Sequence, residues 1–360
     1  MWFRGPPGRG AVRWRPLGAH SPHFPAYNTV RDLLACVDAD DLDRRLRPWM
    51  ERLLGMPVGG IRADGKVLGG SKRAGAPALH GVELVTHTTG MALAQREAVG
   101  GDAAAALLAL LTEAPLDGRM VSMDAGFLNA AVTQTIVQEH GNYLGGVKGD
   151  QAECRRSSMT GSPRRCFSPP DTPPAPLPVA LDQIAPPRRK RQPIGFRREL
   201  QPRRAPDAQT IEQSRGRLEI RELWVVDAGD VGPSLMTAYG WRQVTQIGGL
   251  RRWCRRRHAD LWTVEEVTVV SSRQRTPAQF LASIRNHWTI ENQVHRPRDG
   301  SMQEDRLHGR AIGVILAVCR NVVINLIRRH LPGRYIPTAR NAITTDLGIA
   351  LRWMHLPLRN

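Results

Sequence analysis

The stretch Ile61–Ser71 has the sequence Ile-Arg-Ala-Asp-Gly-Lys-Val-Leu-Gly-Gly-Ser and determines how the rest of the chain is interpreted. Its short apolar run ends on Asp64, where a buried strand is expected to meet solvent. Met120–Ala125 ends on Asp124 in the same manner, and His287–Asn292 places Glu291 on an expected helix. Three carboxylates in the order strand, strand, helix predict a site that holds two divalent metal ions and transfers phosphoryl groups.

The composition points to a polyanionic partner. The 360 residues include 51 Lys and Arg against 33 Asp and Glu, which gives a formal charge of +18. Such a field favours nucleic acid. A membrane surface is the weaker alternative, because the arginines do not follow one face of a single amphipathic helix. The other alternative is a GC-rich genome that inflates arginine use.

The chain has no sign of secretion or of a membrane span. Its five cysteines are scattered without a Cys-x-x-Cys pair, so neither a zinc site nor a disulfide framework is expected. The first 25 residues lack the apolar core of a secretory signal. The longest apolar run, 311–327, is interrupted by Arg320, Asn321 and Asn325 and predicts a core helix. A reducing cytosol suits the scattered cysteines, so we expect a cytoplasmic protein with no membrane partner.

The periodicity of apolar residues predicts an α/β fold. Strands are expected at 59–68, 80–87, 91–98, 118–124 and 142–148, with helices at 103–113 and 128–140. This order, with acidic residues on the first and fourth strands, is typical of a ribonuclease-H-like mixed sheet with flanking helices. In that topology the two strands are neighbours, so Asp64 and Asp124 are expected side by side.

Composition shifts divide the chain into regions. Residues 1–27 form an irregular basic N-terminus, and 28–58 a small helical region that is either a DNA-binding element or a plain helical hairpin. The expected catalytic domain comprises 59–151 and 272–331. Between its parts lies an insertion, 152–271, that is Pro/Arg-rich and disordered over 152–215 and β-rich over 216–271. The Pro/Arg-rich part is a solvated linker, a phosphate-contacting segment or both. A C-terminal helical tail spans 332–360.

Glu291 has the strongest local argument for a function. A helix is expected from Thr276 and Pro277, with Phe280, Ile284 and Glu291 on one side. A carboxylate on an apolar stripe is destabilising unless a cation or a donor meets it. Mg²⁺, or Mn²⁺ in its place, prefers carboxylate oxygens, and two such ions roughly 3.5–4 Å apart activate the attacking oxygen and stabilise the leaving oxygen.

A basic cluster is a candidate nucleic-acid contact. It lies on an expected turn between strands at 241–247 and 261–271, and combines cations with an aromatic side chain, as base-stacking surfaces do. A charged hairpin tip is the alternative. Its residues are Arg251, Arg252, Trp253, Arg255 and Arg256.

Several motifs in fixed order resemble the DDE-type insertion-sequence transposases, specifically the H-repeat-associated group. The family's first block, Asp-Gly-Lys-Thr-Leu-Arg-Gly-Ser, is similar to Asp64–Ser71. Its second block is similar to Asp124–Phe127 followed by Tyr143–Gln151, and its Gly-Arg-x-Glu segment to Gly216–Glu219. The third block, His-Trp-x-Ile-Glu-Asn, is similar to His287–Asn292. The Arg-Asp and Glu-Asp pairs that follow it in the family are similar to Arg298-Asp299 and Glu304-Asp305.

The resemblance implies a bacterial, nucleoid-associated enzyme that cleaves and joins DNA. Asp64, Asp124 and Glu291 would be the metal-binding triad. The residues that would position phosphate or DNA are Lys66, Lys148, His287 and Arg298. The partners implied are the ends of the element and its target DNA, with a homodimer in the synaptic complex.

Some positions depart from the family pattern. Gly69 stands where the family carries Arg, Gly100 and Ala103 lie in a block that has lost its Lys and Glu, and Pro297 replaces an ordinary residue. These changes suggest a truncated or degenerate copy. The alternatives are therefore an inactive DNA-binding remnant and a metal-dependent nuclease on the same fold.

Overall fold

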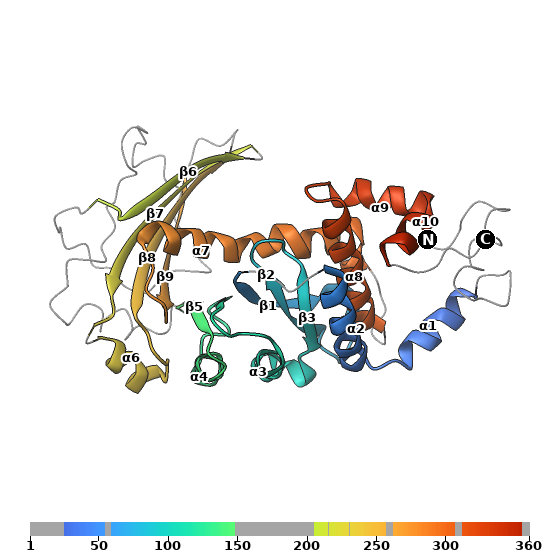
Figure 1. The fold of residues 1–360 in the computed structure, drawn as a ribbon, viewed down its shortest axis with the longest axis horizontal. Coiled ribbons are helices and arrows are strands. Elements are labelled where there is room, and N and C mark those ends of the chain that lie inside the picture. The colour runs from blue at the N-terminus through green and yellow to red at the C-terminus, as the bar shows by residue number, and fades with distance from the viewer. Residues whose placement is uncertain are drawn as a thin grey trace. The chain divides into compact units, whose positions relative to one another are not determined.

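The computed structural model describes residues 25–54, 59–147, 205–214, 216–229, 231–256, 262–306 and 312–354 (Figure 1). The chain forms two compact units. The first comprises Met1–Leu110 with Thr289–Asn360, and the second is Leu111–Trp288. Most of the predicted N-terminal region 1–27 and of the Pro/Arg-rich segment 152–215 lies outside the described residues.

The first unit is built on an antiparallel three-stranded ladder. Its strands are β1 (Ile61–Leu68), β2 (Leu79–Thr86) and β3 (Ala92–Glu97), in the order β3–β2–β1. β1 and β2 pair along their whole length, from Ile61 opposite Thr86 to Leu68 opposite Leu79. All three strands were predicted from their apolar pattern, with ends that differ by one or two residues.

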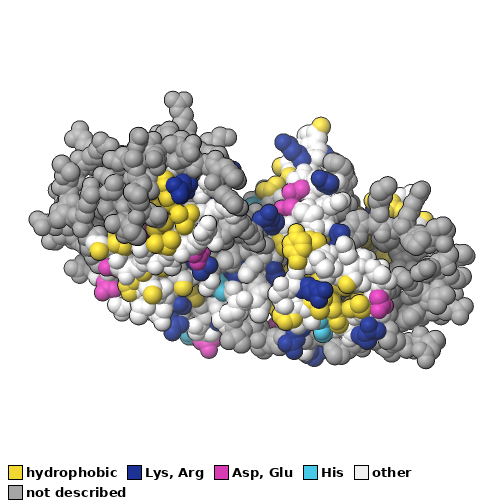
Figure 2. All heavy atoms as spheres, turned by 90° about the horizontal axis from the view of Figure 1, so that it is seen from above, with side chains coloured by type: hydrophobic (Ala, Val, Ile, Leu, Met, Phe, Trp, Pro, Cys, Tyr) yellow, Lys and Arg dark blue, Asp and Glu magenta, His cyan; other side chains and the backbone are white. Residues whose placement is uncertain are grey.

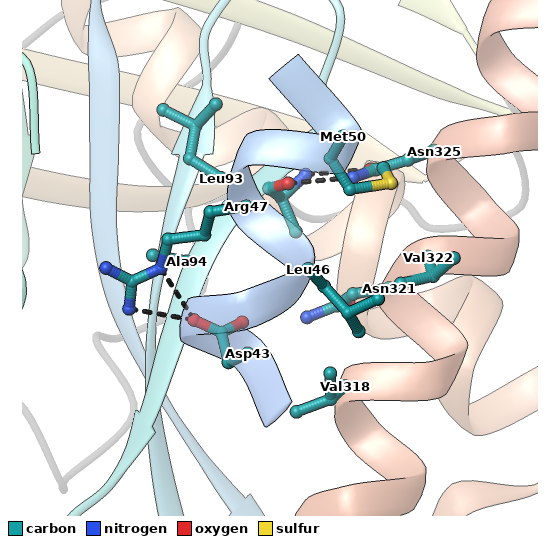
Figure 3. A pocket seen from close by; sticks show the side chains of 11 residues that line it. Asp43, Leu46, Arg47, Met50, Leu93, Ala94, Val318, Asn321, Val322 and Asn325 are labelled. Atoms are coloured by element: carbon teal, nitrogen blue, oxygen red, sulfur yellow. Dashed lines mark hydrogen bonds and ion pairs between the residues drawn. The ribbon is translucent and has the colours of Figure 1, made fainter. Parts of the chain in front are cut away.

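Helices α1 (Tyr27–Ala35), α2 (Ala39–Leu54), α8 (Gly313–His330), α9 (Ile336–Thr345) and α10 (Leu347–Trp353) belong to the same unit. α2 packs against β3 and α8, and Figure 3 shows Leu46 directed toward Val318 and Val322 of α8. The side-chain amide of Asn325 on α8 accepts a hydrogen bond from the backbone N–H of Ala92 at 2.9 Å and donates one to its carbonyl oxygen at 2.7 Å. α2 is therefore part of the core of this unit. None of the helices in the described ranges has the length and hydropathy to cross a bilayer.

The second unit contains a longer, mixed set of strands. Their order is β4–β5–β9–β8–β7–β6, in which β4 (Met120–Met123) and β5 (Asn142–Gly146) are parallel and the remaining pairs are antiparallel. The other strands are β6 (Ala208–Ser214), β7 (Arg217–Asp227), β8 (Gln246–Arg256) and β9 (Thr263–Ser271). The helices are α4 (Ala130–Gln138), α6 (Val231–Tyr239) and most of α7 (Pro277–Ile290), while α3 (Ala103–Glu113) spans the boundary.

Three features of this unit differ from the sequence prediction. β6 lies within 152–215, which was expected to be disordered, because residues 208–214 pair with β7 over their whole length. α6 is a helix inside a region expected to be only β-rich. β8 begins at Gln246 and continues to Arg256, so the basic cluster lies in a strand and not on a turn.

α7 is fixed to the strands by its apolar face. Phe280 has no solvent exposure and packs with Leu223 of β7, Leu250 of β8 and Val269 of β9. The fit is close, since a Cβ placed on Gly248 would lie 2.9 Å from the Phe280 ring. The absence of a side chain at Gly248 is therefore a condition for this helix to approach the sheet.

We predict that Phe280→Ala lowers the free energy of unfolding by about 3–5 kcal/mol, because it leaves a cavity under α7. Ile211→Ala is the control: Ile211 lies in the same unit and is half exposed, so its removal is expected to change stability by about 0.5 kcal/mol or less. Urea unfolding measures both. Equal losses in the two variants would contradict the packing described for α7.

Candidate functional site

Asp64 lies four residues into β1 with a carboxylate that is held at both oxygens. The backbone N–H of Gly65 donates to Oδ1 at 2.8 Å, and Nε2 of His295 lies 2.8 Å from Oδ2. The side chain keeps 21% of its surface exposed. Carboxylate oxygens are hard ligands of the kind that divalent cations prefer. Asp64 is thus both oriented and accessible.

His295 lies between two carboxylates. Its Nδ1 is 3.2 Å from Oε1 of Glu83, on the side opposite Asp64, and the ring is 5% exposed. Burial by itself would lower the pKa of His295. The hydrogen bond to Asp64 and the charges of Glu83 and Asp64 outweigh burial and raise the pKa above its ordinary value. A carboxylate on either side of the ring therefore stabilises the protonated form of His295 relative to an isolated histidine.

Behind His295, Arg298 joins two buried glutamates. Its guanidinium donates to both oxygens of Glu304 at 2.9–3.0 Å and to Oε2 of Glu83 at 2.8 Å. Nδ2 of Asn321 also donates to Oε2 of Glu83, at 3.2 Å. Arg298 is 3% exposed, and each of its three guanidinium nitrogens donates to a protein carboxylate. The sequence assigned Arg298 to phosphate or DNA, whereas in this arrangement it contacts carboxylates.

Lys66 extends the same group of charges. Its Nζ lies 2.6 Å from Oδ2 of Asp299 and 3.7 Å from Glu304, and the residue is 9% exposed. Arg320 of α8 reaches Glu304 from another direction, at 3.4 Å. Burial alone would lower the pKa of Arg298, but the charges of Glu83 and Glu304 raise it, so the guanidinium stays charged. The resulting set of charges, here called the ionic cluster, comprises Lys66, Glu83, His295, Arg298, Asp299, Glu304 and Arg320.

Asp124 belongs to the second unit and has a different setting. It follows β4 directly and is exposed, and its Oδ1 accepts from the backbone N–H of Ala125 at 2.6 Å. Two residues earlier, Oγ of the fully buried Ser122 lies 3.1 Å from Nδ1 of His287 on α7. His287 therefore contacts β4 near Asp124. Its predicted role in DNA binding remains a prediction.

Glu291 lies where the helix changes its geometry. α7 ends at Ile290, and Glu291–His295 is a π-helical turn followed by a second one, Pro297–Ser301. Such turns are rare and occur often at functional sites. The side chain of Glu291 and the whole of Lys148 lie outside what the structure describes. Within the described residues, no three His, Cys, Asp or Glu side chains are grouped so as to hold a metal.

The basic cluster in β8 is bound mostly to protein groups. Trp253 is 1% exposed, and its indole N–H donates to Oε2 of Glu222 at 2.8 Å. Arg251 pairs with Glu266 of β9 at 2.6 Å, and Arg252 with Glu265 at 2.7 Å. These residues therefore stabilise the strands. The two remaining cations are Arg255, which lies over the Trp262 ring, and the exposed Arg256.

Surface cations are dispersed over the face shown in Figure 2, where Lys and Arg side chains of the described residues lie among apolar and polar ones. The structure brings together Asp64, Lys66 and Arg298 of the predicted set. Sequence reasoning gave no role to Glu83, His295 or Glu304. Two features of the sequence could have drawn attention to them: Glu83 lies inside the apolar run of β2, and His295 lies on the apolar side of the expected helix.

The described residues form a mixed α/β protein with an oriented and accessible carboxylate at Asp64. A family model described as "Transposase DDE domain" matches residues 55–314. The chain belongs to this family. Its mixed strands and flanking helices are consistent with the ribonuclease-H-like fold of DDE transposases, as the sequence predicted.

Individual relatives agree with the family. The chain is 23% identical over 339 residues to "Putative transposase YncI" of Escherichia coli O157:H7, which covers 89% of this chain and 75% of the relative. It is also 23% identical over 321 residues to "H repeat-associated putative transposase YhhI" of Escherichia coli K12, which covers 84% of this chain and 73% of the relative. The resemblance to the H-repeat-associated group is thereby confirmed.

We predict that Arg298→Gln lowers the free energy of unfolding by about 3–5 kcal/mol, because it removes the buried guanidinium that binds both Glu83 and Glu304. Arg296→Gln is the matched control, because Arg296 lies two residues earlier in the same segment and is exposed. Thermal and urea unfolding of the two variants test this. A similar loss of stability in both variants would show that the buried contacts of Arg298 do not account for its contribution to the free energy of unfolding.

Proposed function

We propose that this protein is a DNA transposase that cleaves phosphodiester bonds and transfers DNA strands with the help of divalent metal ions. Asp64, Asp124 and Glu291 are the proposed metal ligands. The observation that carries the proposal is the Asp64 carboxylate, oriented at both oxygens and still accessible, in a chain that belongs to the DDE family. Hard oxygen ligands of this kind suit Mg²⁺ or Mn²⁺.

Two ions would supply Lewis-acid activation of the attacking oxygen and stabilisation of the leaving oxygen. The chain's own residues do the remaining work. His295 and the Gly65 N–H fix the direction of the Asp64 carboxylate. His287 contacts Ser122 and so ties α7 to the strand that leads to Asp124. Lys66 and Arg298 act through the ionic cluster, and not by direct contact with DNA.

DNA is the proposed partner, bound through the exposed cations of a chain with a formal charge of +18. Among the predicted DNA-binding residues, the exposed Arg256 is proposed to contact phosphate. Lys148 and His287 keep their predicted roles in this proposal. Binding of this kind weakens with salt as counterions are released. A homodimer that joins two element ends is part of the proposal.

We predict that Asp124→Asn reduces Mg²⁺-dependent cleavage of terminal-repeat DNA by at least about 100-fold, because the amide cannot serve as an anionic ligand. Asp117→Asn is the matched control: Asp117 is an exposed aspartate in the turn before β4 and is expected to leave cleavage unchanged. Gel analysis of nicked and joined products measures both.

The same assay separates the alternatives. If wild type and Asp124→Asn cut equally poorly while both bind DNA, the chain is an inactive DNA-binding remnant, as the departures at Gly69, Gly100 and Ala103 would suggest. If the wild type cuts but never joins strands, the chain is a nuclease. Joined products that depend on Asp124 support the transposase.

A further inference from the structure

β1 and β2 place two carboxylates directly opposite each other. Asp64 pairs with Glu83 in the antiparallel register, so both side chains project from the same face. Like charges at such a position repel and destabilise the ladder. Glu83 is only 2% exposed, so solvent cannot screen the repulsion effectively. Some cationic or donor group between them is required for this pair of strands to be stable.

His295 occupies that position. Its Nε2 contacts Asp64 at 2.8 Å and its Nδ1 lies 3.2 Å from Glu83, so one ring faces both acids. The contact with Glu83 is one of charge, because Nδ1 and Oε1 lack the alignment of a hydrogen bond. The directed bond of the imidazole is therefore the one to Asp64.

The contacts of Glu83 restrict the orientation of the His295 ring. Glu83 receives Arg298 at 2.8 Å and Asn321 at 3.2 Å, both through Oε2, which leaves Oε1 toward His295. His295 is also 5% exposed and belongs to the π-helical turn that begins at Glu291. The orientation of Asp64 is thus set by a chain of contacts that begins at Arg298.

We propose that His295 is the positioning residue of the metal-binding carboxylate Asp64, an inference that rests on the function proposed above. By holding Oδ2, His295 fixes the side-chain rotamer of Asp64 and so the direction from which a cation reaches its carboxylate. Groups that orient a metal ligand from outside typically change metal affinity about 10–100-fold when they are removed.

The test measures Mn²⁺ binding to the full chain by electron paramagnetic resonance, beside the thermal midpoint of each variant. His295→Leu keeps the volume without a donor and is expected to weaken Mn²⁺ binding about tenfold. His295→Gln restores a donor and is expected to recover most of the affinity. His80→Ala is the matched control, because His80 lies three positions from Glu83 on β2, on the opposite face.

Unchanged affinity in His295→Leu, or equal losses in His295→Leu and His295→Gln, would overturn the positioning role. Asp64→Asn separates this outcome from failure of the proposed function: if Asp64→Asn binds Mn²⁺ as the wild type does, the metal assignment itself is wrong, and the inference falls with it. If His295→Leu does not fold, histidine-selective NMR of the wild type decides. Mg²⁺ should shift the Nε2–H resonance of His295 and leave His80 unchanged, and the absence of a shift overturns the proposal.

Discussion

The first unit depends on the pairing of one buried cation, Arg298, with Glu83 and Glu304. An ionised group removed from water is stable only if opposite charges and hydrogen bonds replace its hydration. The bidentate contact with Glu304 and the bond to Glu83 do this. Each partner is then itself a buried charge that requires Arg298. Loss of the guanidinium would remove the hydrogen bonds of both glutamates to Arg298 at once, so the contacts of the ionic cluster depend on one another.

This interdependence extends to the proposed metal ligand. Glu83 holds one side of His295, and His295 holds Asp64. The cations that the sequence motifs place near the acidic residues therefore divide into two kinds. Lys66 and Arg298 are buried and bind carboxylates, whereas exposed cations such as Arg256 remain able to meet phosphate. Net charge attracts DNA over a distance, but it does not say which arginine makes contact.

Local pattern was sufficient for most of the elements. The alternation of apolar residues located the strand that carries Asp64 and the strand that precedes Asp124, and the apolar helix 103–113 was predicted with the bounds observed for α3. β6 was missed because its few apolar residues stand at the end of a long Pro/Arg-rich segment, and its order comes from pairing with β7. The π-helical turn at Glu291–His295 was missed as well, since the apolar spacing of the helix continues through it.

The sequence by itself determined the order of the elements, the three acidic candidates and the family, because these are carried by short motifs and by periodicity along the chain. Only the tertiary structure decided what each charged side chain touches. Asp64 and His295 are 231 positions apart, and Glu83 and Arg298 are 215 apart. Ion pairing depends on distance and burial in space, and neither is encoded in local spacing. The histidine that orients Asp64 could therefore be identified only once the chain was folded.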